Sequence, residues 1–171
     1  MPANAEENIC EEKRFNEIFK IHAKDLYNFM FYKYGEDNNP EDLVQEAFIK
    51  LWDNCHKVLP EKARAFLFTV ANNQMLNELS KKKTVMRYKQ EKHKAYTIES
   101  PEYIMEEDEY MKRLQSAIES LTDDQRVTFL LNRIEDKKHE EIAKMLGISR
   151  KAVEKRIYKA VEIITKKIGK I

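Results

Sequence analysis

The side chains best suited to do chemistry in this chain are those that bind bases and phosphates, and they gather in two stretches. Residues 139–161 read HEEIAKMLGISRKAVEKRIYKAV, and residues 63–82 mix aromatic, amide and basic side chains. Arg and Lys bind phosphates and guanine, and Glu can accept a hydrogen bond from cytosine. No nucleophile–base pair or metal-ligand spacing is evident, so we expect no catalytic residue, no cofactor and no metal. The pattern favours a nucleic-acid-binding protein over an enzyme.

The first of these stretches predicts two helices joined by a tight turn. Gly147 can adopt the positive φ that follows a helix end, and Ser149 can cap the next helix. Each helix has an inward apolar face: Ile142, Ala143 and Leu146 in the first, and Val153, Ile157, Ala160 and Ile164 in the second. Such a helix-turn-helix can place its second helix in the DNA major groove, and basic residues predominate after residue 149. The alternative is an ordinary helical hairpin with a solvated basic face.

Composition and length indicate an all-α protein with one domain or two small ones. The 171 residues include three Gly and four Pro, and no alternating run of β-branched residues predicts a sheet. Cys10 and Cys55 lie far apart without a CxxC motif, so we expect buried or incidental thiols, neither a disulfide framework nor a zinc site. The start lacks an apolar signal segment, and no run approaches the ~20 apolar residues of a membrane span. We therefore expect a cytoplasmic protein without membrane insertion.

Apolar spacing predicts two helices in the first part of the chain. The first spans about Glu11 to Lys33 and carries His22 on its apolar stripe, where we expect a core or boundary histidine. The second starts at Asn39 as N-cap, with Pro40 at the first helical position. We expect its inward side to bury Val44, Ala47, Phe48, Leu51 and Trp52. Its other side carries Asp42, Gln45, Glu46, Ile49 and Asp53, and is either a solvated face or a docking surface for a basic helical partner.

A third helix, expected from about Ala63 to Lys82, combines an apolar stripe with amides and cations. The stripe comprises Phe66, Leu67, Val70, Ala71 and Leu79. Around it lie Lys62, Arg64, Phe68, Thr69, Asn72, Asn73 and Asn77, followed by Lys81, Lys82 and Lys83. Amides near aromatic rings and Lys suit single-stranded bases, because amides bond base edges, rings stack and cations follow the backbone. A tolerated polar face explains the same composition equally well.

Charge then divides the chain. Basic residues predominate over 81–94 and acidic ones over 97–109, which predicts a charged linker between two domains. A helix follows from about Glu106 to Glu119, and Thr122 to Gln125 is a capping box that begins another. In that helix we expect Val127, Leu130, Leu131 and Ile134 to face inward. With the helix-turn-helix, the second domain has four helices.

These segments, in this order, resemble an extracytoplasmic-function (ECF) sigma factor of bacterial RNA polymerase. The resemblance rests on PEDLVQEAFIKLW, on ARAFLFTVANNQMLNEL, and on LTDDQRVTFLLNRIEDKKHEEIAKMLGISRKAVEKRIYKA. It implies two small helical domains: sigma domain two, a helical bundle over residues 11–83, and sigma domain four over residues 108–168, joined by a charged linker over residues 84–107. The implied function is promoter-specific transcription initiation by reading −35 duplex DNA and melted −10 bases.

The resemblance also implies partners and site residues. Docking on the β′ coiled coil of core polymerase falls to Asp42, Gln45, Glu46, Phe48, Ile49 and Trp52. Binding of the −10 element falls to Lys62, Arg64, Phe66, Asn72, Asn73, Asn77, Lys81, Lys82 and Lys83, with a flipped base at Asn73 and base specificity in the loop 56–62. Reading of the −35 bases falls to Lys151, Glu154, Lys155 and Tyr158, with phosphate contacts from Arg150, Arg156 and Lys159. The β flap, promoter DNA and an anti-sigma factor of the kind many relatives have complete the implied partners of a chain that is monomeric when free.

Three positions depart from the family pattern. Phe66 stands where Trp is usual, Glu154 stands where relatives often have Arg, and a later position of the same helix is Val161. Because Glu repels phosphate but can bond cytosine, Glu154 predicts a promoter preference unlike that of relatives with Arg. Two other classes stay open from the sequence: an operator-binding regulator that binds a palindrome as a dimer, and a purely helical adaptor of the anti-sigma kind.

Overall fold

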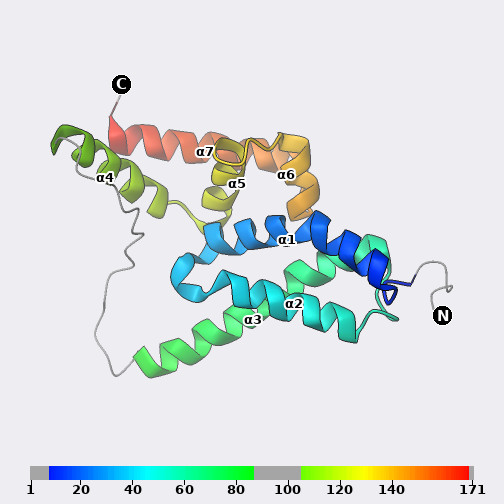
Figure 1. The fold of residues 1–171 in the computed structure, drawn as a ribbon. Helices are drawn as coiled ribbons and strands as arrows, with labels where there is room; N and C mark the ends of the chain where they lie inside the picture. The colour runs from blue at the N-terminus through cyan, green and yellow to red at the C-terminus, as the bar shows by residue number, and fades with distance from the viewer. Residues whose placement is uncertain (1–7, 87–104, 170–171) are drawn as a thin grey trace. The chain divides into compact units, whose positions relative to one another are not determined.

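The computed structural model describes residues 8–86 and 105–169, and every regular element in these ranges is helical (Figure 1). The described chain separates into two compact units, divided between Ala95 and Tyr96. The first holds α1 (Glu12–Tyr34), α2 (Pro40–Asp53), α3 (Ala63–Met86) and two 3-10 turns, η2 (Glu36–Asn38) and η3 (Pro60–Lys62). The second holds α4 (Met105–Glu119), α5 (Asp123–Arg133), α6 (His139–Leu146) and α7 (Arg150–Ile168). The all-α prediction is confirmed, while most of the predicted linker lies outside the described residues.

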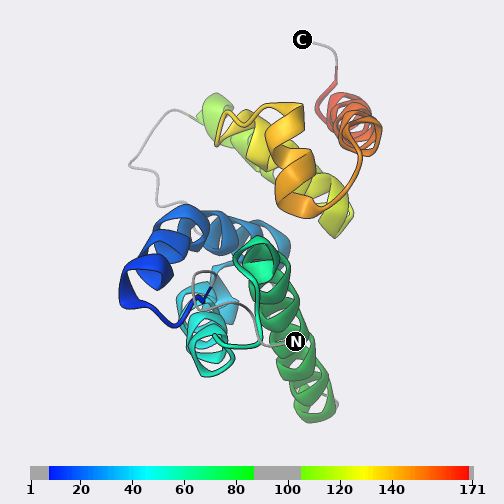
Figure 2. The same cartoon turned by 90° about the vertical axis from the view of Figure 1, so that its right-hand side faces the viewer.

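The first unit is a bundle in which α2 contacts both α1 and α3. Figures 1 and 2 show α1 and α2 side by side, and the chain reverses direction between them. Its centre consists of side chains that are almost wholly inaccessible, contributed by all three helices: Leu26, Met30, Ala47, Leu51, Leu67, Ala71 and Met75. Burial of such apolar surface is the main favourable term in folding, so this core holds the three helices in one arrangement.

Three expectations for this unit are wrong in detail. Trp52 is 44% exposed, although its spacing from Phe48 placed it on the inward side of α2. On α3, Phe68 is buried whereas Phe66 is only partly covered, so the core stripe is rotated from the predicted one toward Phe68 and Met75. Asn39 precedes α2 in a left-handed conformation, with φ 49° and no side-chain capping bond. Asn tolerates this region better than most residues, and here its backbone turns the chain instead of capping the helix.

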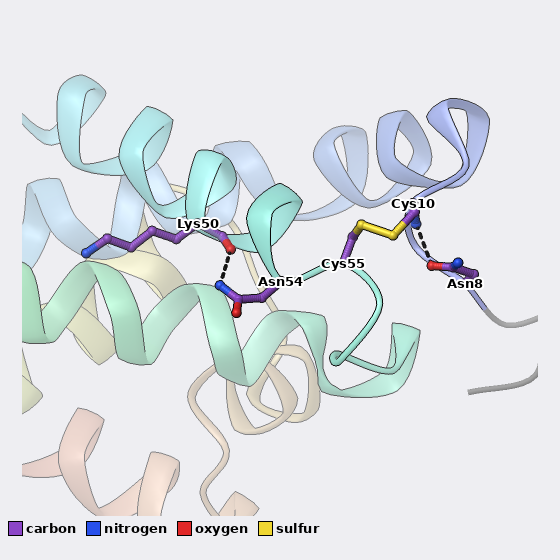
Figure 3. The surroundings of a disulfide bond; sticks show 5 residues. All are labelled: Asn8, Cys10, Lys50, Asn54 and Cys55. Atoms are coloured by element: carbon purple, nitrogen blue, oxygen red, sulfur yellow. Dashed lines mark hydrogen bonds between the residues drawn. A yellow bond between two sulfur atoms is a disulfide. The ribbon is translucent and has the colours of Figure 1, made fainter. Parts of the chain in front are cut away.

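The two cysteines form a disulfide, which corrects the expectation of incidental thiols. Cys10 and Cys55 have Cα atoms 5.0 Å apart, within the range that a disulfide requires. Cys10 lies just before α1 and Cys55 just after α2, so reversal of the chain between these helices brings the two thiols together (Figure 3). Spacing along the sequence carried no sign of this pair, because it depends on how the two helices lie.

The second unit is a four-helix domain organised around α7, which contacts α4, α5 and α6. Ala117 and Leu121 from the α4 side meet Ala160 and Ile164 of α7 in one apolar cluster. Two small alanines in that cluster allow the helices to approach closely. The fully buried Leu131, Ile142 and Val153 extend the apolar interior into α5, α6 and the start of α7.

Local signals position the elements of this domain as predicted. Thr122 and Gln125 form the reciprocal capping box at the start of α5. Gly147 ends α6 with φ 67°, and the Ser149 hydroxyl accepts a hydrogen bond from the backbone N–H of Ala152 at 3.1 Å. These features produce the helix-turn-helix of α6 and α7. None of the helices in the described ranges combines the length and apolar character needed to cross a membrane.

Ile134 is the exception to the predicted inward face of α5. Ile134 keeps a helical conformation, with its N–H bonded to the Leu130 carbonyl at 2.8 Å, yet it is 65% exposed because nothing in the described part of the chain covers its side chain at the end of α5. Leu131, by contrast, has no accessible surface.

This contrast gives a matched pair of substitutions. Leu131→Ala should destabilise the second unit by about 2–5 kcal/mol, because it removes a buried side chain and leaves a cavity. Ile134→Ala should change stability by less than about 0.5 kcal/mol. Hydrogen exchange of the α5 and α7 amides, measured by mass spectrometry on the full chain, compares the two variants. Equal protection in both would contradict the described position of Leu131.

Candidate functional site

One side of α2 presents polar and apolar side chains to solvent in a continuous strip. Asp42, Gln45, Glu46, Ile49 and Trp52 are all exposed, with Ile49 at 59% and Trp52 at 44%. Their spacing of three or four residues places them along one side of the helix. We call these five residues the docking face. An exposed Ile and Trp among acidic and amide groups is a combination suited to binding another protein, because partner contact buries apolar area and pairs the charges.

The docking face stands on a layer of aromatic side chains. Phe48, which was expected to be buried and to support docking from within, is 4% exposed and lies beneath the docking face. The ring of Phe15 meets the ring of Trp52 edge to face, with centroids 5.1 Å apart, and meets Phe48 at 6.1 Å. Phe19 lies 4.8 Å from Phe48 on the same centroid measure. Contacts from α1 therefore hold the end of the docking face in place.

The three amides of α3 fall into two structural classes. Asn72 is partly buried, and its side-chain oxygen accepts a hydrogen bond from Lys33 Nζ at 3.0 Å and another from the Tyr34 hydroxyl. Asn73 and Asn77 are exposed. The oxygen of Asn72 therefore joins α3 to the end of α1, whereas the amides of Asn73 and Asn77 are presented to solvent.

Cations and rings surround these amides. Lys62 and Lys81 are exposed, and Phe66 is partly exposed. The Arg64 guanidinium lies 5.8 Å from the ring centroid of Phe68, which keeps its charge near the start of α3. Lys82 Nζ donates to Asn38 Oδ1 at 3.3 Å. The side chain of Lys83, predicted to belong with them, lies outside the described residues.

The outward side of α7 combines cations with one acid and one aromatic ring. Lys151, Glu154, Lys155, Tyr158 and Lys159 are exposed, and Tyr158 reaches 71%. We call these five residues the recognition face. Because α6 holds the start of α7 across the Gly147 turn, the first residues of the face project from the end of a helix-turn-helix. This is the part of such a motif that contacts base edges in a major groove.

Acidic residues restrain two of the arginines expected to contact phosphate. Arg150 bonds Glu154 within α7 and Glu140 of α6, each at 3.1 Å. His139 Nδ1 lies 3.8 Å from the same carboxylate of Glu154. Arg156 pairs with Asp124 of α5 at 3.6 Å and is partly buried. Both arginines therefore pair with carboxylates of their own domain at partly exposed positions, so contact with phosphate requires them to share or exchange these partners.

Several residues that shape the candidate site were not predicted from the sequence. Lys33 and Tyr34 come from the end of α1, and Glu140 and Asp124 come from α6 and α5. Each meets its partner across two elements, so periodicity within one helix could not reveal the pairing. The one available signal is the Lys33-Tyr34 pair directly before Gly35, where two side chains with polar ends follow the apolar stripe of the first helix.

His22 connects the electrostatics of α1 and α3. Burial lowers the pKa of His22 below its ordinary value of 6.5, the neighbouring Asp25 carboxylate opposes that shift, and the Arg64 charge adds to it. The partly buried position agrees with the expected boundary histidine. Folding therefore favours the neutral imidazole.

Comparison with known proteins matches both units to two regions of one family. Residues 18–85 match the family described as Sigma-70 region 2, and residues 111–164 match Sigma-70, region 4. The first match contains the docking face and Asn73, and the second contains the recognition face.

Individual relatives are distant in sequence but span most of the chain. The ECF RNA polymerase sigma factor SigX of Bacillus subtilis (strain 168) is 23% identical over 91% of this chain and 84% of its own length. SigE of Mycolicibacterium smegmatis, also described as an ECF RNA polymerase sigma factor, is 26% identical over 85% of this chain and 58% of its own length. The chain thus spans just over half of that second relative.

A solved structure shares the fold. The sigma factor RpoE, crystallised with the anti-sigma factor NepR from Bartonella quintana, aligns over 90% of this chain and 96% of its own, with a TM-score of 0.57 and 19% identity.

The lowered pKa of His22 predicts a pH dependence. A histidine whose folded pKa lies below its unfolded value opposes folding once the unfolded chain can protonate, so stability falls as pH drops through 6.5 toward the folded pKa. Replacing it in His22→Gln should remove this part of the acid sensitivity. Urea unfolding of both proteins at several pH values between about 5 and 8 measures the difference. An unfolding free-energy difference that does not vary with pH would contradict the shift.

Proposed function

We propose how this chain, which belongs to the ECF sigma factors and so directs RNA polymerase to promoters, divides that task between its two domains. The first unit binds core polymerase through the docking face and captures melted −10 bases at α3. The second reads duplex −35 DNA through the recognition face. The chain has no catalytic role of its own, because sigma factors are initiation factors and the polymerase performs the chemistry.

The exposed pair of Ile49 and Trp52 within an acidic strip carries the polymerase part of the proposal. Apolar side chains of this size are usually covered, and here they lie on the helix matched to region 2. A basic, helical partner surface would pair with Asp42 and Glu46 while covering Ile49 and Trp52. The coiled coil of the β′ subunit is the partner that family membership suggests, with the β flap as the contact for the second domain.

Capture of the −10 element is assigned to Asn73 with Asn77 beside it. A flipped base loses stacking that costs a few kcal/mol, and a pocket must return that energy through hydrogen bonds and ring contacts. Asn73 is exposed and offers both a donor and an acceptor, whereas the Asn72 oxygen already accepts from Lys33 and Tyr34. Lys62, Lys81 and Lys82 supply positive charge along the phosphate backbone of the melted DNA strand.

Reading of the −35 element is assigned to the recognition face. Lys151, Lys155 and Tyr158 can reach base edges or phosphates, and Glu154 can accept a hydrogen bond from cytosine N4. The bond from Arg150 orients the Glu154 carboxylate and lowers its repulsion of the DNA backbone. This arrangement supports the inference that the promoter preference differs from that of relatives with Arg at the position.

Because RNA polymerase acts in the cytoplasm, we infer that the chain is cytoplasmic, and the family resemblance suggests a monomer when free. An anti-sigma factor is a further candidate partner, since the sigma factor RpoE was crystallised with one, NepR. Such a partner would compete with core polymerase for the docking face.

Reconstitution tests the proposal as a whole. The purified chain added to the core polymerase of its own organism should yield promoter-specific transcripts that core alone does not make. Binding of the free chain to palindromic DNA as a symmetric dimer, without association with core, would instead support an operator-binding regulator and refute the proposal.

The docking face predicts a specific loss of polymerase binding. Ile49→Glu should weaken affinity for core about tenfold or more, because it places a charge in an apolar contact. The fold should not change, because Ile49 is exposed. Ile21→Glu is the matched control, since Ile21 is 64% exposed on α1. Fluorescence anisotropy with labelled protein measures both affinities. Equal affinities would remove Ile49 from the interface.

The amide of Asn73 predicts a defect in promoter opening. Asn73→Ala should lower permanganate reactivity of the −10 region about tenfold or more while core affinity stays unchanged, because the flipped base loses its hydrogen bonds. The control Asn16→Ala removes an exposed amide from α1. A promoter with a pre-melted bubble should restore transcription by the Asn73 variant. If opening on duplex promoter matches the parent, the assignment of Asn73 is wrong.

A further inference from the structure

The disulfide lies where it can act on the docking face. The backbone N–H of Cys55 donates to the carbonyl of Trp52 at 3.1 Å, so Cys55 continues directly from the turn that carries Trp52. Asn54 follows the last residue of α2, and its side-chain amide donates to the Lys50 carbonyl at 2.8 Å (Figure 3). A covalent bond at Cys55 therefore constrains the last turn of the helix that bears the docking face.

The other end of the bond is anchored in the first unit. Ile9 has no accessible surface, and the N–H of Cys10 donates to Asn8 Oδ1 at 2.9 Å. Burial of Ile9 therefore adds a contact besides the disulfide that holds the segment before α1. Through Phe15, whose ring meets Trp52, α1 also contacts the docking face by packing. The disulfide adds a covalent clasp to a contact that side chains already make.

The two sulfur atoms differ in access. Cys55 is buried at 7% exposure, whereas Cys10 is partly exposed. An external reagent would therefore reach Cys10 first, and Cys55 would serve as the resolving thiol. No other cysteine is present in the chain, so no competing partner can divert the exchange.

We propose that Cys10 and Cys55 form a reversible oxidation site that closes a clasp between the start of α1 and the end of α2 and thereby strengthens binding to core polymerase. The oxidant is a low-molecular-weight disulfide. The Cys10 thiolate attacks one of its sulfur atoms and releases one small thiol, and the Cys55 thiolate then attacks Cys10 and releases the second. Each protein thiol gives up one proton and one electron, and the small disulfide becomes two thiols.

The effect on binding rests on the proposed function, whereas the chemistry of the pair does not. Cytoplasmic thiols are ordinarily reduced, so the clasp would close only under oxidising stress. Closing it removes freedom from the open chain between residues 10 and 55 and fixes Trp52 before the partner arrives. A surface ordered in advance loses less entropy on binding, and the closed form should bind core more tightly.

The first experiment needs no polymerase. The full chain is equilibrated in buffers of reduced and oxidised glutathione, its thiols are alkylated and counted by mass spectrometry, and its melting is followed by calorimetry. Oxidation should consume both thiols within one chain and raise Tm of the first unit by roughly 10–20 °C, because the bond closes a long loop. Cys10→Ser and Cys55→Ser should each show the same Tm in both buffers. Thiols that stay reduced, a bond between chains, or an unchanged Tm would overturn the proposal.

A further experiment with Zn²⁺ distinguishes an oxidation site from a metal site. His56 joins the two cysteines in a group whose ligand atoms all lie within 4.8 Å, and two thiolates with an imidazole could bind Zn²⁺. If the reduced chain gains stability from added Zn²⁺, loses it in EDTA and loses the response in His56→Asn, the pair is a metal site and the oxidation proposal fails.

The second experiment measures core polymerase affinity in both redox states. The oxidised chain should bind about threefold or more tightly than the reduced chain, and the serine variants should not respond. If oxidation raises Tm but the two redox states bind core polymerase with equal affinity, the proposed effect of the disulfide on polymerase binding is wrong. Absence of core binding in both states would instead refute the proposed function, so the two failures are distinguishable.

Discussion

Burial of one side of α2 between α1 and α3 determines what the opposite side can do. Ala47 and Leu51 have no accessible surface, and this fixes the rotation of the helix about its axis. Because an α-helix has 3.6 residues per turn, burial of one side determines that the docking face lies on the exposed side. The same constraint brings Phe15 onto Trp52 and places Cys55 beside Cys10. The docking face, its aromatic support and the clasp therefore all depend on one packed interface.

The second domain follows the same logic with α7 as the shared element. Its inner side supplies Val153, Ile157, Ala160 and Ile164 to the core, so the recognition face lies on the remaining arc. Gly147 and Ser149 set the angle at which that arc is presented. The partly exposed ion pairs of Arg150 and Arg156 add contacts from α7 to α6 and α5, while the buried side of α7 holds the helix in place. The base reading proposed for this face would require side chains held in position.

Local chemistry made much of this architecture predictable from the residues, whereas contacts between distant segments were not. The capping box at Thr122 and the turn at Gly147 involve residues within four positions, so composition and spacing suffice. Ile134 shows where periodicity fails, since it keeps the helical repeat of α5 but lies beyond the part of that helix that the core covers. The hydrogen bond from Lys33 to Asn72 and the Cys10–Cys55 bond depend on helix packing, which no repeat within one helix encodes. The exposure of Trp52, which supports the proposed docking role of α2, likewise depends on helix packing, and the residues alone had placed this side chain inside.

The pairing of Arg150 with Glu140 and Glu154 has a consequence for how ionic strength acts on DNA binding. Each cation that neutralises a phosphate normally releases a condensed counterion, and the number released sets the slope of log affinity against log salt. Arg150 is already neutralised within the protein. If Arg150 binds a DNA phosphate, it must give up a protein carboxylate as its partner. The freed carboxylate of Glu140 or Glu154 then takes up a cation from solution, which offsets the counterion released from the DNA. The salt slope of this domain should thus be shallower than its count of lysines and arginines implies, and its affinity less sensitive to changes in intracellular potassium.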